Sequence, residues 1–150
     1  MTRGEKAEAL FREGYTCSQA VVLAFEDVTG LDRETACRLS ASFGSGMGRL
    51  REVCGGVSGM LMVAGYLYGF SDPTDRAAKA AHYALVQEMA RRFRERNGSI
   101  ICRELLGGAG QDHAPTPTER TPAFYKKRPC LRMVSSAAEI MDEILREKQK

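Results

Sequence analysis

The sequence has 150 residues, 43% of them hydrophobic, which is enough for one continuous core and predicts a single domain over residues 1–150. Its 22 basic and 19 acidic side chains are interspersed and leave a net charge of only +3, which does not favour a nucleic-acid partner. The N-terminus alternates charged and apolar residues and lacks the apolar segment of a secretory signal, so we expect a cytoplasmic protein.

The periodic stretches are rich in Ala, Leu, Met, Glu, Arg and Lys, and alternating β-branched runs are nearly absent. This pattern predicts an all-α fold, a compact single-domain bundle of about five to seven helices. In chain order, the helices are expected at residues 3–12, 17–30, 33–43, 50–69, 73–97, 99–106 and 130–148.

Local signals support several of these boundaries. Thr16 and Asp32 are typical N-caps for the second and third helices, and Asp72 with Pro73 predicts the start of the fifth. We expect Ala36, Leu39 and Phe43 to face the core from the third helix. The residues expected to face inward from the fifth helix are Ala77, Ala80, Ala81, Ala84, Leu85, Met89 and Phe93.

Two segments are expected to be loops. Gly44–Arg49 (GSGMGR) is too flexible to continue a helix, and its backbone amides could surround an anion or a neighbouring element. It follows a helix and lacks a GK[ST] ending, so nucleotide binding is not favoured. Residues 107–129 hold four prolines and predict a long surface loop, in which Lys126, Lys127 and Arg128 form a solvated basic face.

The segment 53–70 is uncharged but contains five glycines, so we interpret it as a buried helix rather than a membrane span, which needs roughly 20 apolar residues. Gly55 and Gly59 share one helix face and permit close approach of another backbone. That face, with Tyr66 and Tyr68, would serve either a homodimer or packing within one chain.

The five cysteines are the candidate functional residues. Cys17, Cys102 and Cys130 fall at or near predicted helix starts and Cys54 in a first turn, where unpaired amides and the helix dipole favour the thiolate. The glycines that follow Cys54, namely Gly55, Gly56 and Gly59, would leave room for a partner sulfur or a cofactor. Cys37 falls within a helix and is interpreted as structural, and each of the others could equally be a small buried hydrophobe.

Spacing alone does not identify the chemistry. The chain has no CxxC or CxxCH motif, and His82 and His113 lack the helical partners of a histidine metal site.

The chain resembles the redox-active family of bacterial and archaeal proteins named for the cysteine pattern C_GCAxxG_C_C. The resemblance rests on YTCSQAVVLAF, SFGSGMGR, VCGGVSGMLMVAGYLYG, CRELLG and the PC that precedes SAAEIMDEIL. In this sequence Val53 precedes the motif cysteine and a glycine replaces the usual small residue. The resemblance implies that Cys17, Cys54, Cys102 and Cys130 are the four family cysteines and that they support redox activity.

Three hypotheses remain open. In the first, the four cysteines converge for thiol–disulfide exchange or electron transfer, with Cys54 or Cys17 attacking, as in a thiol–disulfide oxidoreductase. In the second, the same four thiolates bind zinc or an iron–sulfur cluster. In the third, the chain is a non-enzymatic helical interaction module. The wide spacing of the cysteines favours the first, with an unidentified redox protein or small molecule as partner and no cofactor required.

Overall fold

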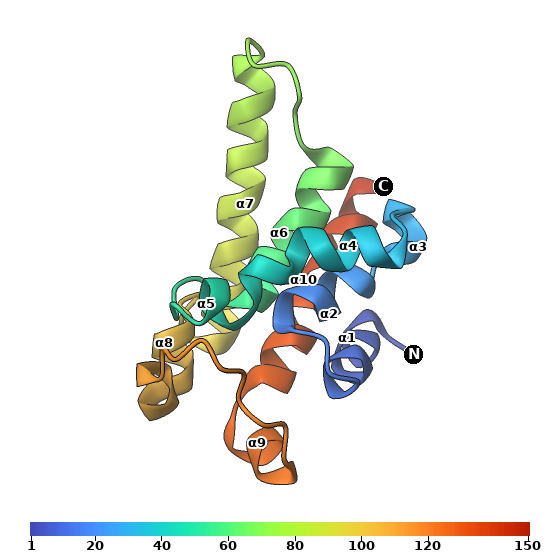
Figure 1. The fold of residues 1–150 in the computed structure, drawn as a ribbon. Coiled ribbons are helices and arrows are strands. Elements are labelled where there is room, and N and C mark those ends of the chain that lie inside the picture. The colour runs from blue at the N-terminus through green and yellow to red at the C-terminus, as the bar shows by residue number, and fades with distance from the viewer.

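The computed structural model describes residues 1–150, is 72% helical and has no strands, which confirms the all-α class. It has nine helices rather than five to seven, because the helix expected at residues 17–30 is divided in two and α9 (Pro122–Lys127) forms within the expected loop. The helices are α1 Arg3–Arg12, α2 Cys17–Leu23, α3 Glu26–Thr29, α4 Arg33–Ser40, α6 Gly55–Tyr68, α7 Arg76–Asn97, α8 Cys102–Leu106, α9 Pro122–Lys127 and α10 Cys130–Lys148 (Figure 1). Between them lie the 3₁₀ turns η1 Ala41–Phe43 and η2 Gly107–Gln111, and the segment labelled α5, Gly44–Gly48.

Helix α10 runs through the middle of the molecule and packs against α1, α2, α6 and α7 (Figure 1). Its apolar residues recur at helical spacing, so one face is buried against these neighbours while charged residues face solvent. Complete burial of each large apolar side chain contributes about 1.5–3 kcal/mol to stability. The buried residues of this face are Met133, Val134, Ala137, Ala138, Ile140, Met141 and Ile144.

The N-terminal helices follow the predicted capping signals. Thr2 and Thr16 each form a capping box, with Glu5 and Gln19 respectively, and Gly30 ends α3 in a left-handed conformation. The single helix expected over residues 17–30 is instead divided between α2 and α3 at Phe25, whose φ of −118° and ψ of 18° are not helical. The Phe25 side chain is fully buried, so packing overrides local helix propensity at this point.

The expected inner face of α4 is only partly confirmed. Ala36 is buried and Phe43 is half-buried, but Leu39 is 56% exposed and was assigned to the wrong face. The helix is short and contacts mainly α2 and η1, so only a narrow face of it is buried and Leu39 lies outside that face.

Helix α6 begins at Gly55 and not at residue 50. Arg49 and Arg51 have left-handed φ values of 71° and 62°, which a helix cannot include, and Val53 forms an antiparallel bridge with Ile101. The start predicted from apolar composition was therefore five residues too early.

Helix α7 begins at Arg76, where the Asp75 carboxylate accepts the amide of Ala78 at 2.9 Å. Asp72, expected to be this cap, instead accepts the amide and hydroxyl of Thr74 in the preceding turn. The first half of α7 extends beyond the bundle (Figure 1), and only Met89 and Phe93 are buried. Four alanines expected to face the core are thus exposed, namely Ala77, Ala80, Ala81 and Ala84.

The long loop expected at residues 107–129 contains η2 and α9, so its non-helical part is reduced to residues 112–121. Thr121 caps α9 by accepting the amide of Phe124, and Pro122 occupies the first helical position. No helix of the structure combines the length and the apolar composition that crossing a membrane requires.

Candidate functional site

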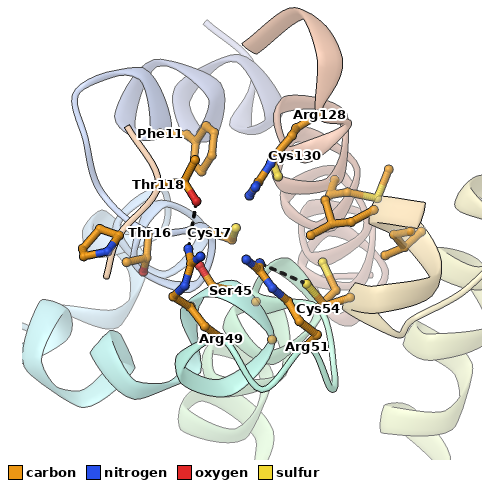
Figure 2. A pocket seen from close by; sticks show the side chains of 18 of the residues that line it. Phe11, Thr16, Cys17, Ser45, Arg49, Arg51, Cys54, Thr118, Arg128 and Cys130 are labelled. Carbon is orange, nitrogen blue, oxygen red and sulfur yellow. Dashed lines mark hydrogen bonds between the residues drawn. The ribbon is translucent and has the colours of Figure 1, made fainter. Parts of the chain in front are cut away.

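A pocket of about 440 Å³ lies where four helices begin, and four of the five cysteines line it (Figure 2). Cys17, Cys102 and Cys130 are the first residues of α2, α8 and α10, and Cys54 is the N-cap residue of α6. The predicted placement at helix starts is therefore confirmed. Cys37 lies in α4 and does not line the pocket.

Glycines allow α6 to approach its neighbours closely. A Cβ atom on Gly55 would lie 2.9 Å from Cys17 Cβ, and one on Gly59 would lie 2.8 Å from the carbonyl oxygen of Ser18. Gly56 faces α10, where a Cβ would lie 3.2 Å from the Met133 carbonyl oxygen. Of the three glycines predicted to adjoin a cofactor, only Gly55 lines the pocket, and the others serve helix packing.

Two short extended segments place Cys54 and Cys102 on the same wall. The Cys54 amide donates to the Ile100 carbonyl at 2.8 Å, and the Cys102 amide donates to the Glu52 carbonyl at 2.6 Å. These bonds flank the bridge between Val53 and Ile101. The pairing is long-range, so the local sequence carried no signal for it.

The glycine-rich segment α5 is a left-handed turn and not a helix. Ser45, Gly46 and Met47 have φ values of 58°, 71° and 70°, and the turn directs the Ser45 amide at the sulfur of Cys17. A Cβ on Gly46 would lie 2.7 Å from both Arg51 Cα and Cys102 Cβ, so only glycine fits there. Of the backbone amides expected to surround an anion or a neighbouring element, that of Ser45 interacts with the Cys17 thiol.

Cys17 is the acidic thiol of the pocket. Its pKa is lowered to about 7, chiefly by a hydrogen bond with the Cys130 thiol and also by the Ser45 amide and the charge of Arg120, although burial opposes the shift. The same hydrogen bond, together with burial, raises the pKa of Cys130. The pair therefore loses its first proton from Cys17 near pH 7, while Cys130 keeps its proton.

Cys54 and Cys102 are neutral thiols. Burial, followed by the charge of Cys17, raises the pKa of Cys54 to about 12. Burial also raises the pKa of Cys102, although an N–H of Arg51 lies 3.9 Å from its sulfur and opposes that effect. Outside the pocket, burial raises the pKa of Cys37 as well.

Sequence reasoning missed the charge of the pocket. Its lining contains four arginines and no Asp, Glu, Lys or His, and the arginines are Arg49, Arg51, Arg120 and Arg128. Arg128, expected to belong to a solvated basic face, is half-buried and points into the pocket (Figure 2). Arginines are mostly exposed in proteins, so neither composition nor periodicity indicates that these four converge.

Arg49 holds the segment 112–121 against the pocket. Its guanidinium donates to the Ala114 carbonyl, to the Thr118 hydroxyl at 2.9 Å and to the Asp112 carboxylate at 2.9 Å. Only 9% of its side chain is exposed. Such charge-assisted bonds are stronger than neutral ones, so this segment forms a fixed wall of the pocket.

The side chains do not form the predicted metal centre. All five cysteines are free thiols, and no group of three or more His, Cys, Asp or Glu side chains is arranged to hold a metal ion.

Comparisons with curated proteins and with solved structures give no match. A family profile described as "Putative redox-active protein (C_GCAxxG_C_C)" matches residues 15–144, a span that includes all four cysteines of the pocket. The chain belongs to this family.

Proposed function

We propose that the protein is a thiol–disulfide redox protein in which Cys17 and Cys130 form the reacting pair. The observation that carries this proposal is the convergence of the two thiols, the first residues of α2 and α10, on one pocket open to small molecules. Both residues are half-buried, so a reactant in the pocket can reach them. Cys17 is the nucleophile, because thiolates rather than thiols attack disulfides.

The reaction begins when the Cys17 thiolate attacks one sulfur of a substrate disulfide. A mixed disulfide forms, and the other half of the substrate leaves as a thiolate, which takes up a proton. Cys130 then loses its proton and attacks the sulfur of Cys17, and the second half of the substrate leaves as a thiol. In sum, two protein thiols lose two electrons and two protons, and the substrate disulfide becomes two thiols. An external dithiol would reduce the protein again.

Cys54 and Cys102 are placed for a later exchange. Both are buried neutral thiols in the same pocket, so they are poor first nucleophiles. Attack of either thiol on the Cys17–Cys130 disulfide would form a new disulfide that includes a buried cysteine and would free Cys17 or Cys130. This role accounts for four cysteines at one site where a simple exchange needs two.

Thiol counting tests the proposal. The reduced chain has five thiols, and mild oxidation by a small disulfide should remove two together, with recovery after dithiol reduction. A Cys37→Ser control should lose two of its four remaining thiols in the same way. A thiol count that oxidation leaves unchanged, or a Cys17→Ser variant that still loses two thiols at the wild-type rate, would overturn the proposal.

A further inference from the structure

The pocket has an excess of positive charge with an unused hydrogen-bond donor. Two of its arginines are already engaged. Arg49 pairs with Asp112, and Arg120 donates to the carbonyls of Phe11 and Tyr15 at 2.7 and 3.1 Å. The remaining two, Arg51 and Arg128, are available to a ligand.

Arg51 is the most informative of these residues, because only 1% of it is exposed. Its Nε donates to the Asp112 carbonyl at 2.9 Å, its Nη1 lies 3.9 Å from Cys102 Sγ, and its Nη2 is buried without a hydrogen-bond partner. A buried donor without a partner costs about 1–3 kcal/mol, and more when it belongs to a charged group. A ligand with an acceptor at this position would recover that energy.

Arg128 approaches the same space from the opposite side. Its guanidinium stacks over the Phe124 ring at 4.9 Å, and its end points towards Cys17, as does that of Arg51 (Figure 2). Two guanidinium groups therefore face one another across the pocket, next to the proposed nucleophile. Guanidinium groups bind carboxylates and other oxyanions through paired N–H donors.

Stabilisation of the thiols alone does not account for this arrangement. Arg51 Nη1 lies 3.9 Å from the sulfur of Cys102, and that thiol is neutral. The free Nη2 serves no sulfur.

We propose that the substrate is a small disulfide bearing a carboxylate or another oxyanion near its S–S bond, and that Arg51 and Arg128 bind this anion beside Cys17. The proposal rests on the proposed function and specifies its substrate class. The pocket volume of about 440 Å³ suits a small molecule, and the wall formed by residues 112–121 restricts access for a folded protein.

The test compares three methanethiosulfonate reagents of similar size that carry a sulfonate, a hydroxyl or a trimethylammonium group. Each transfers its thioalkyl group to the Cys17 thiolate with release of methanesulfinate, and mass spectrometry of the Cys17 peptide gives the rate. We expect the sulfonate reagent to react at least about 10-fold faster than the neutral one, and the cationic reagent to be slowest. Ratios between reagents cancel any change in the pKa of Cys17, because all three react with the same thiolate.

Arg51→Gln and Arg128→Gln should each lower the anionic-to-neutral ratio several-fold. The matched control is Arg38→Gln, because Arg38 is an exposed arginine that pairs with Glu34 outside the pocket lining, and this variant should keep the wild-type ratio. Arg128 is only half-buried, so its variant provides the test even if Arg51→Gln fails to fold. In the wild type, inorganic sulfate should slow the sulfonate reagent more than the neutral one, relative to chloride at equal ionic strength.

An anionic-to-neutral ratio near one in the wild type would overturn this proposal, as would an unchanged ratio in a folded Arg128→Gln variant. If either result were found together with reversible loss of two thiols, the proposed substrate class would be wrong and the proposed redox function would still stand. A strong anionic preference without any reversible thiol loss would instead overturn the redox function.

Discussion

The hydrogen bond from Cys130 makes a quantitative prediction about the reactivity of Cys17. Replacing Cys130 with alanine removes the main cause of the lowered pKa, so the pKa of Cys17 should rise from about 7 towards its ordinary value of 9.0. At pH 7, the thiolate fraction then falls from about one half to about 1%, roughly a 50-fold loss. The more basic thiolate is intrinsically about 8-fold more nucleophilic, for a Brønsted coefficient of about 0.45. The net prediction is a Cys17 that reacts about 6-fold more slowly at pH 7.

The order reverses at high pH. At pH 10 Cys17 is mostly ionised in the wild type and in the variant alike, so only its intrinsic nucleophilicity differs. Cys17 of Cys130→Ala should then react about 7-fold faster than Cys17 of the wild type. The assay is the rate of mixed-disulfide formation at Cys17 with the neutral reagent 2-hydroxyethyl disulfide, measured from pH 5 to 11. The wild-type rate should rise with pH to a midpoint near 7, because the thiolate is the attacking form.

Cys37→Ala is the matched control, since Cys37 lies outside the pocket, and its midpoint for Cys17 should stay near 7. A wild-type midpoint near 9, or a midpoint that Cys130→Ala leaves unchanged, would refute the assignment of Cys130 as the hydrogen-bond donor.

Other regions of the structure give further predictions. Gly59→Ala should lower the free energy of unfolding in urea by about 1–3 kcal/mol, because its Cβ would lie 2.8 Å from a backbone oxygen of α2. Gly65→Ala, on the same helix but with nothing within 4 Å, should instead raise it by about 0.5–1 kcal/mol. Arg49→Met should speed limited proteolysis within residues 112–121 by at least about 10-fold, which corresponds to about 1.4 kcal/mol, whereas the exposed Arg38→Met should not. Anaerobically purified protein should contain much less than one zinc or iron per chain by elemental analysis, and a stoichiometric content would favour the metal hypothesis.

Local signals predicted much of the fold because they act over a few residues. The capping threonine Thr16 and the terminating glycine Gly30 set helix ends through short hydrogen bonds and backbone conformation. The placement of cysteines at helix starts followed from such signals. The paired glycines Gly55 and Gly59 correctly indicated a close helix contact, which α2 provides.

Features that depend on distant contacts were not predictable in this way. The start of α6 was misplaced because the bridge between Val53 and Ile101 joins segments far apart in the chain. The periodicity of α7 identified an apolar face but not where the core ends along it, so Ala77 and Ala80 were expected to be buried. The burial of Arg51 arises only when the pocket walls assemble around it.

The most direct test of the central claim is to identify the disulfide itself. Reduced protein would be treated with one equivalent of a small disulfide, the remaining thiols blocked, and the peptides mapped by mass spectrometry without reduction. The account predicts a single major cross-link between Cys17 and Cys130, with Cys54, Cys102 and Cys37 recovered as blocked thiols. A major cross-link between two other cysteines, or a stable mixed disulfide on Cys17 that Cys130 never resolves, would contradict it.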